Sequence, residues 1–280
     1  RELTAFLDKL RGCDVTFAVQ DFRSTFAALR PGDVVYCDPP YAPVSATANF
    51  TSYTGGGFGV QEQVDLAILS HGHRDHGGGM VRFMELNRKA RLYLRPQALE
   101  PHFSQKTQGL AQVGVEADRL PRERLVLTGD LEQIDGELTL FARVEGRRFW
   151  SDSNSNLMKE EAGALVPDDF THEQDLIVTE GEKKILIAGC SHNGVANILD
   201  RYHQLTGGWP DVVVGGFHLL SPGTGRSVPA DQVRQLGEYL ASLPCRYLTG
   251  HCTGPEAYDV LKEVLGDRLE ALTTGGVWEL

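Results

Sequence analysis

Three histidines and one aspartate fall within six residues of this chain, in the run His71-x-His73-x-Asp75-His76, directly after a short apolar stretch. Neutral imidazole and carboxylate groups are good ligands for zinc and similar divalent ions. A loop that leaves a strand can turn alternate side chains toward one point, and the three glycines that follow allow close backbone packing. The alternative, a polar surface loop with solvated histidines, would not require this spacing. The pattern therefore predicts a metal site, with His71 and His73 at one ion and Asp75 and His76 facing a second.

Two further histidines have a similar setting far along the chain. His192 follows the apolar stretch Ile185–Ala188, and His251 follows Arg246–Leu248. Both precede a segment with helical periodicity, and a metal site must be closed from several sides. We therefore expect His192 and His251 to be ligands as well.

The sequence suggests different roles for the remaining histidines and for two of the cysteines. His218, in Gly215-Gly216-Phe217-His218, ends another apolar stretch; it is a third candidate ligand and also a candidate for the catalytic and substrate-binding group. Cys190 and Cys252 stand beside expected ligands, where contact with metal is one interpretation and packing as small buried side chains is the favoured one. Histidines that lack this setting are not expected to bind metal, and these are His102, His172 and His203.

From Val64 onward, short apolar stretches alternate with segments of helical periodicity. Helices are expected near 195–205 and 230–243, and a third from Pro255, a residue suited to the first helical turn. This alternation predicts an α/β layered architecture. The expected strands are Val64–Leu69, Arg91–Leu94, Leu138–Ala142, Ile185–Ala188, Val212–Val214 and Arg246–Leu248.

The first 63 residues follow another pattern. Two short strands are expected at Val15–Val19 and Val34–Cys37, followed by a loop over 38–59 that is rich in Pro, Ala, Thr, Ser and Gly. A loop of this length without apolar periodicity is unusual inside a compact domain. We therefore expect two parts, 1–63 and 64–280, with the first poorly integrated with the second and tethered as a flap.

Composition restricts the class of protein. The net charge of −11 argues against nucleic-acid binding by the whole surface, and no run of 18 apolar residues suggests a membrane span. The start, Arg1-Glu2-Leu3, lacks the pattern of a secretory signal. The five cysteines include no CxxC pair and do not suggest a disulfide framework. We expect a cytoplasmic protein that acts on a small molecule.

The run Ser70–Gly79 resembles the signature of the metallo-β-lactamase fold superfamily. The strings GCSHNG (189–194), GGFHL (215–219), HCTG (251–254) and PDDFTHEQDLIV (167–178) resemble the branch of 7,8-dihydropterin-6-ylmethyl-4-(β-D-ribofuranosyl)aminobenzene-5'-phosphate synthases. The resemblance covers about 64–280 and implies an αββα sandwich whose opening strands are missing or replaced here. It also implies one or two divalent metal ions, expected to be zinc with manganese or iron as alternatives. By this resemblance one ion is held by His71, His73 and His192, and the other by Asp75, His76 and His251.

Residues 36–53, YCDPPYAPVSATANFTSY, resemble the catalytic stretch of DNA adenine N6-methyltransferases of the doubly wound, S-adenosylmethionine-dependent kind. In the turn Asp38-Pro39-Pro40-Tyr41, Asp38 and the Pro39 carbonyl would accept from an adenine amino group and Tyr41 would stack on the base. The family's Phe-x-Gly-x-Gly cofactor loop has no counterpart in residues 1–37. Residues 1–63 also hold five Lys/Arg against seven Asp/Glu. Binding of S-adenosylmethionine or DNA is therefore not expected, and the chain is interpreted as a hybrid.

The favoured reading is a metal-dependent hydrolase that activates water for attack on a carbonyl or phosphoryl centre of a small anionic molecule. Asp75 is expected to orient the water, while His218 and Arg226 are candidates for binding the substrate; a solvated loop charge is the simpler interpretation of Arg226. Two alternatives stay open. One is a fragmentary DNA adenine methyltransferase with a hydrolase-like tail, and the other is a non-catalytic, metal-stabilised binding module.

Overall fold

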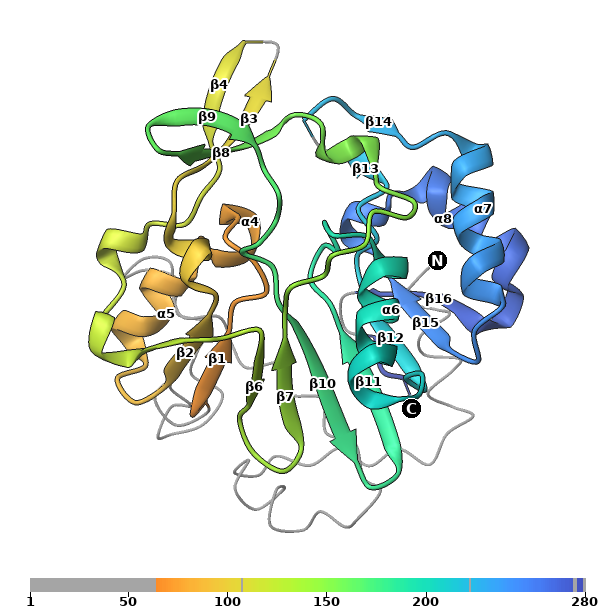
Figure 1. Ribbon diagram of the computed structural model, residues 1–280, viewed down its shortest axis with the longest axis horizontal. Helices are drawn as coiled ribbons and strands as arrows, with labels where there is room; N and C mark the ends of the chain where they lie inside the picture. The colour runs from red at the N-terminus through yellow and green to blue at the C-terminus, as the bar shows by residue number, and fades with distance from the viewer. Residues whose placement is uncertain (1–63, 107, 222, 274–275, 279–280) are drawn as a thin grey trace, which may run out of the picture. The chain divides into compact units, whose positions relative to one another are not determined.

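The computed structural model describes residues 64–106, 108–221, 223–273 and 276–278 (Figure 1). The chain divides into two compact units, and all of these residues belong to the unit formed by 59–278. The two strands and the flap expected before residue 63 lie outside the described residues. The same holds for the methyltransferase-like turn formed by Asp38, Pro39, Pro40 and Tyr41.

Two sheets carry most of the described strands. The smaller is parallel, in the order β1-β2-β5, and the larger has the order β16-β15-β12-β11-β10-β7-β6. The six strands expected from the sequence are present within a residue or two of their predicted positions. The strands of the smaller sheet are β1 (Leu66–Ile68), β2 (Arg91–Leu94) and β5 (Leu125–Leu127). Those of the larger sheet are β6 (Leu131–Gln133), β7 (Leu138–Phe141), β10 (Asp175–Glu180), β11 (Lys183–Ile187), β12 (Val212–Gly215), β15 (Arg246–Thr249) and β16 (Leu269–Ala271).

Strand direction in the larger sheet changes at β11. From β11 through β12 and β15 to β16 the neighbours are parallel, whereas β11, β10, β7 and β6 pair antiparallel. Parallel neighbours have their carboxyl ends at one edge of the sheet, where side chains from different loops can converge. The loops that leave β11, β12 and β15 therefore begin close together.

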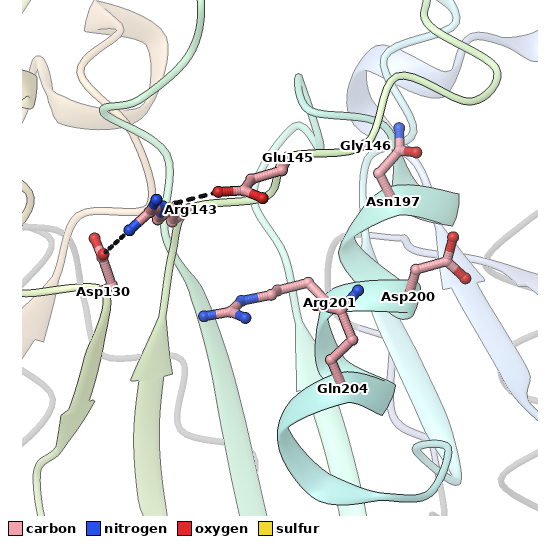
Figure 2. Close-up of a pocket in the computed structure, with 8 residues that line it drawn as sticks. All are labelled: Asp130, Arg143, Glu145, Gly146, Asn197, Asp200, Arg201 and Gln204. Carbon is pink, nitrogen blue, oxygen red and sulfur yellow. Dashed lines mark hydrogen bonds and ion pairs between the residues drawn. The ribbon is translucent and has the colours of Figure 1, made fainter.

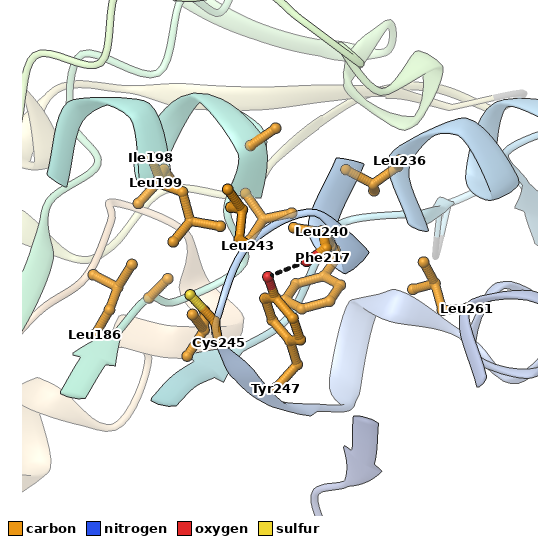
Figure 3. Packing of buried hydrophobic residues seen from close by; sticks show 14 of the residues in the cluster. Leu186, Ile198, Leu199, Phe217, Leu236, Leu240, Leu243, Cys245, Tyr247 and Leu261 are labelled. Carbon is orange, nitrogen blue, oxygen red and sulfur yellow. Dashed lines mark hydrogen bonds between the residues drawn. The ribbon is translucent and has the colours of Figure 1, made fainter. Parts of the chain in front are cut away.

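Three amphipathic helices cover the parallel half of the larger sheet, as predicted (Figure 1): α6 (Val195–Thr206), α7 (Ala230–Ala241) and α8 (Pro255–Leu265). Gly207 ends α6 with φ of 73°, a conformation that favours glycine. The buried faces of the helices form one apolar core with the sheet, including Leu199, Leu240 and Tyr247 (Figure 3). None of the helices in the described residues is long and apolar enough to cross a membrane.

A second, smaller core lies against the three-stranded sheet. Helix α5 (Met80–Leu86) contributes Val81 and Met84, which pack with Leu92 and Leu94 of β2. Helix α4 (Arg74–Gly77) precedes it and carries part of the histidine motif. Gly77 is required there because a Cβ atom would lie 2.3 Å from a methyl group of Val115. Gly77 thus permits the close packing that the sequence predicted, whereas a Cβ atom at Gly79 would meet no neighbour.

One buried amide ties the two sheets together beside the histidine motif. The Gln174 side chain donates to the carbonyl oxygens of Leu69 (2.9 Å) and Tyr93 (3.1 Å), and it accepts from the Thr128 hydroxyl (2.6 Å). Its backbone N–H donates to the Ser70 carbonyl at 2.8 Å. Because buried amide groups are costly to leave unpaired, these bonds set the position of the smaller sheet against β10.

Two small sheets stand above the strand ends (Figure 1). They were not predicted, since their strands are short and mostly exposed on one face. Each lies next to the loops that carry the histidines, so they form walls of the site. The four-stranded sheet has the order β4-β3-β8-β9, with β3 (His102–Lys106), β4 (Gly109–Gln112), β8 (Leu157–Glu161) and β9 (Ala164–Pro167). The two-stranded sheet pairs β13 (Leu220–Ser221) with β14 (Arg226–Ser227).

Candidate metal centre

The strand-end loops of both sheets bring the predicted ligands together. His71 and His73 follow β1 of the smaller sheet, His192 follows β11 of the larger one, and His251 follows β15. The loop after β11 approaches the loop after β1 closely at Gly189. This approach requires glycine, because a Cβ atom there would lie 2.4 Å from the Ser70 hydroxyl oxygen. These candidate ligands therefore lie between the two sheets, at the strand ends from which the sequence predicted them to come.

Three residues in the loops of the larger sheet have left-handed backbone conformations. The φ angles are 55° at Ser191, 49° at His218 and 52° at His251. A residue other than glycine in this region costs on the order of 1–3 kcal/mol, and such strain is concentrated at functional sites. Each of these residues follows an apolar strand and is itself, or directly precedes, a histidine of the candidate site.

The first group of ligands consists of His71, His73 and His192. Their ring centroids are 4.8–4.9 Å apart in all three pairs. All three side chains are buried, and each Nε2 atom lacks a hydrogen-bond partner among the described residues. Buried polar atoms are almost always satisfied, so three orphaned nitrogens in one buried cluster form a set that could hold a metal ion. One ligand atom from each ring lies within 4.8 Å of the other two.

The ring of His192 is held in one orientation and one tautomer. The amide nitrogen of Asn154 donates to the His192 carbonyl at 2.8 Å, so the Asn154 oxygen is left to accept from His192 Nδ1 at 3.0 Å. Nδ1 therefore carries the proton and Nε2 presents a lone pair. Phe170 stacks on the ring at a centroid distance of 4.7 Å and an interplanar angle of 5°. This is the support that a metal-binding histidine ordinarily receives.

Burial keeps the first group neutral. It lowers the pKa of His71, His73 and His192 well below the ordinary 6.5, and neighbouring imidazoles lower it further. Bringing three charged rings this close in a dry site would be strongly unfavourable. Neutral imidazole is the form that binds a divalent cation, so the three rings are ready to bind one near neutral pH.

The second group consists of Asp75, His76 and His251, as predicted, together with Cys190. The Nε2 atoms of His76 and His251 are 3.2 Å apart, and the Cys190 sulfur lies 3.1 Å from His76 Nε2. Asp75 Oδ2 lies 3.7 Å from His76 Nε2 and 3.5 Å from His251 Nε2. These four ligand atoms lie within 4.8 Å of one another. The group is more open than the first, since Asp75 and His251 are about half exposed.

A buried carboxylate supports the loop that carries His192. Glu173 accepts from the backbone N–H of His192 at 2.7 Å and from the backbone and side-chain nitrogens of Asn193, both at 2.9 Å. Burial raises the pKa of Glu173, although these hydrogen bonds oppose the shift. Burial, and then the charge of Glu173, raise the pKa of Asp175 well above its ordinary range. Neither carboxyl was singled out in the sequence, because nothing in its local pattern distinguishes it from a surface acid.

Behind His73 lies a second buried network, made by two histidines that were not expected to be ligands. Asp168 Oδ2 lies 2.9 Å from His102 Nδ1 and 3.3 Å from His172 Nε2. His172 Nδ1 accepts from the backbone N–H of Gly72 at 2.9 Å, so the proton of this ring is on Nε2 and points to Asp168. Burial raises the pKa of Asp168, but the bonds from both histidines outweigh it and hold the pKa well below its usual range. The network positions the backbone between His71 and His73.

Asp168→Asn is expected to weaken metal binding by the first group by about 10- to 100-fold, the usual loss when an outer hydrogen-bond partner is removed. Both histidines bond to Oδ2 of Asp168, and the backbone N–H of Phe170 donates to Oδ1 at 2.9 Å. The amide has only one acceptor oxygen and no charge, so its own N–H groups must face one of these donors. Competition with a chromophoric chelator measures the change. Asp169→Asn is the control, because Asp169 is partly exposed and pairs with Lys159. Equal affinities in the two variants would contradict a positioning role for Asp168.

A cavity of about 400 Å³ opens onto both groups of ligands. His218 faces it with a side chain that is only 4% exposed and has no hydrogen-bond partner among the described residues at either ring nitrogen. Its ring lies 4.1 Å from that of His192, and its carbonyl accepts from the Ser151 hydroxyl at 2.6 Å. Two cations line the cavity, Arg74 and Lys106. The structure does not bring Arg226 to this cavity: the residue is exposed on β14 and lines a separate surface hollow.

Figure 2 shows another cavity, of about 250 Å³, beside α6. Its lining is of mixed charge, and Arg143 is already paired with Glu145 at 2.9 Å and with Asp130 at 3.5 Å. None of the histidines lines it. His203 is also remote from the metal centre, since its ring stacks on Trp209 at 4.3 Å. The chemistry of this part of the chain is therefore concentrated in the histidine-lined cavity.

The arrangement of sheets and ligands is similar to a known fold. The crystal structure of a metal-dependent hydrolase of the β-lactamase superfamily superposes with a TM-score of 0.63 and 26% sequence identity, covering 76% of this chain and 78% of that chain. The described residues have the metallo-β-lactamase fold. A relative found by sequence is the 7,8-dihydropterin-6-methyl-4-(beta-D-ribofuranosyl)-aminobenzene-5'-phosphate synthase of Methanocaldococcus jannaschii, which is 26% identical to this chain over 226 residues. The match covers 77% of this chain and 75% of the archaeal protein.

The start of the chain has a different set of relatives. Residues 1–95 match the model of D12 class N6 adenine-specific DNA methyltransferases. The DNA adenine methylase of Serratia marcescens is 50% identical over 70 residues, which is 25% of this chain and 25% of that enzyme. The chain thus spans about a quarter of the methylases that it matches. A segment similar to adenine methyltransferases thus opens the chain, as the motif at 36–53 indicated, and the match extends to residue 95.

Proposed function

We propose that this chain is a metallohydrolase that binds one or two divalent transition-metal ions, zinc foremost, and hydrolyses a small anionic molecule. The observation that carries this proposal is the group of three buried Nε2 atoms, from His71, His73 and His192, that lack partners among the described residues. His73 and His192 line a cavity large enough for a small substrate. The donor set fits the metal, because neutral imidazole, carboxylate and thiol groups suit zinc better than magnesium or calcium.

A divalent ion in this site would supply Lewis acidity and lower the pKa of a coordinated water toward 7. The protein groups then have separate roles. The six residues of the predicted set, His71, His73, Asp75, His76, His192 and His251, hold the ions. Asp75 also presents a half-exposed carboxylate that can accept a proton from the attacking water. His218 lines the same cavity beside His192, with no hydrogen-bond partner among the described residues at either ring nitrogen, and would bind the substrate or deliver a proton to the leaving group.

The substrate is proposed to carry a phosphate or carboxylate group. Arg74 and Lys106 line the same cavity and provide positive charge near its mouth. The name of the archaeal relative includes a 5'-phosphate, although that protein is named as a synthase. We infer that recognition of an anionic group is what the two proteins share. Arg226, exposed on β14, would take part only if a substrate extended beyond this cavity.

Metal content and turnover test the proposal together. Elemental analysis of the full chain is expected to give one to two equivalents of transition metal, and screening of ester and phosphoester panels is expected to give turnover that a chelator abolishes. The His71→Ala/His73→Ala variant should lose the first equivalent and the turnover. Less than about 0.2 equivalents in folded, metal-supplemented protein would show that the site is misassigned. Full metal content without turnover on any panel would favour a metal-stabilised binding module.

The methyltransferase segment suggests a second candidate function, because residues 1–95 match a family of adenine-specific enzymes. The chain contains no counterpart of that family's cofactor loop before Asp38. We therefore expect no methylation of duplex DNA with labelled S-adenosylmethionine. Micromolar binding of the labelled cofactor that Asp38→Ala abolishes would contradict this expectation. The same assay on the Asp65→Ala variant is the control, since Asp65 is an exposed carboxylate paired with Lys89.

A further inference from the structure

The thiol of Cys190 lies where the two groups of ligands meet. Its sulfur is 3.1 Å from His76 Nε2 and belongs to a set with Asp75 and His251 whose ligand atoms lie within 4.8 Å of one another. It also lies within the same distance of ligand atoms of His192 and His218. The side chain is 2% exposed. A buried sulfur with imidazole and carboxylate neighbours on several sides is not in an apolar environment.

The other free cysteines of the described residues have different surroundings. Cys245 is part of the apolar core beneath α6 and α7, among leucines and Tyr247 (Figure 3). Cys252 lines the same cavity as Cys190, with its sulfur 3.6 Å from the Cys190 carbonyl, but it belongs to none of the described groups of side chains that could hold a metal ion. Cys190 belongs to two such groups and to neither apolar cluster. Its surroundings therefore favour contact with metal over packing as a small buried side chain.

The Cys190 thiol would add a fourth donor to the second group of ligands. Without Cys190, the second group offers one carboxylate and two imidazoles, and two of these three side chains are about half exposed. Zinc in proteins prefers four ligands, and catalytic sites keep one position for water or substrate. A thiolate would supply the one buried anionic donor of the group. It would also make the site selective, because soft sulfur ligands favour zinc, iron and cobalt over magnesium, calcium and manganese.

We propose that Cys190 is a thiolate ligand of the second metal ion, completing the set formed by Asp75, His76 and His251. The assignment rests on the proposed function, since it requires that the site binds metal. It goes beyond the histidine and aspartate ligands expected from the sequence. The turn after β11 determines where Cys190 lies. Gly189 allows this turn to approach Ser70, and the left-handed backbone at Ser191 lets the side chains of Cys190 and His192 point in different directions. One short loop thereby serves both ions.

Cobalt substitution tests the assignment without reference to activity. Co²⁺ replaces zinc in such sites, and a thiolate ligand adds an intense near-ultraviolet charge-transfer band that nitrogen and oxygen ligands do not give. The full chain is titrated with Co²⁺, and the bound metal is counted by elemental analysis. The band is expected to appear in the wild-type protein and in Cys245→Ser and Cys252→Ser. It is expected to be lost in Cys190→Ser, which should keep the visible bands of cobalt bound to histidine.

The possible outcomes separate this inference from the proposed function. Two bound ions with no charge-transfer band, or a band lost in Cys252→Ser and retained in Cys190→Ser, would overturn the assignment of Cys190 and leave the metallohydrolase intact. No bound metal at all would overturn both. If Cys190→Ser does not fold, X-ray absorption of the wild-type zinc protein decides instead. A sulfur scatterer at about 2.3 Å supports the thiolate, and a shell of nitrogen and oxygen alone at about 2.0–2.2 Å excludes it.

Discussion

Replacing His192 by alanine is expected to remove one metal equivalent and to reduce turnover by more than about 100-fold. Loss of an outer partner costs up to about 100-fold in metal affinity or activity, and a direct ligand should cost more. The variant leaves His71 and His73 without a third ligand and removes the ring that lies against His218. Elemental analysis and steady-state kinetics on the full chain measure the two losses.

His203→Ala is the matched control for this experiment. His203 is also a partly buried histidine, but its ring stacks on Trp209 and its Nδ1 donates to the Gly208 carbonyl, away from the cavity. It should keep both the metal and the turnover. Circular dichroism of both variants checks that the fold survives. If His192→Ala retained both metal equivalents and normal turnover, the ligand assignment would be wrong.

Without metal, the free energy of unfolding is expected to fall as the pH drops below about 6.5. Five buried or partly buried histidines have lowered pKa values, mainly through burial: His71, His73, His76, His172 and His192. In the unfolded chain they take up protons below pH 6.5, whereas the folded chain resists protonation. Their contribution to stability is therefore complete above pH 6.5 and is lost as the pH falls toward the folded pKa values.

Two buried carboxyl groups act in the opposite direction. The raised pKa values of Glu173 and Asp175 let the folded chain keep protons that the unfolded chain releases. Because more histidines than carboxyl groups are shifted, the expected net effect is a loss of stability as the pH falls below about 6.5. Urea unfolding in chelator across this range measures the slope. His73→Gln should make the slope shallower, and a stability independent of pH would refute this account.

Much of the fold followed from local patterns. The apolar stretches at 185–188, 212–214 and 246–248 became β11, β12 and β15, and Pro255 opens α8 as expected. These elements are buried on faces whose periodicity the sequence displays directly. Similarity to known proteins supports the metallo-β-lactamase fold and the methyltransferase segment that the motifs indicated. The roles of the individual site residues stay predictions that the proposed experiments address.

The sequence was less informative where contacts depend on distant segments. Asp168 and His102 are 66 positions apart, and only the folded chain brings them within hydrogen-bond distance behind His73. Cys190 was read as a packing residue because a lone cysteine has no spacing to interpret. Arg226 was selected for its charge and its loop, but the direction of β14 decides where it lies. The positions of His102 and Arg226 depend on how the small sheets lie over the strand ends, and that of Cys190 depends on the turn after β11. Periodicity in the sequence does not encode these arrangements.

The division of the ligands between the two sheets has a consequence for the whole chain. An ion held by His73 and His192 would cross-link positions about 120 residues apart, comparable in span to a long-range disulfide. Unlike a disulfide, this link is lost when the chain unfolds, so its contribution follows mass action. A free-ion concentration a thousandfold above the dissociation constant would add about 4 kcal/mol, and depletion of the ion would remove it. Part of the stability of this fold is then set by the metal supply of its surroundings, and the lifetime of the protein would track that supply.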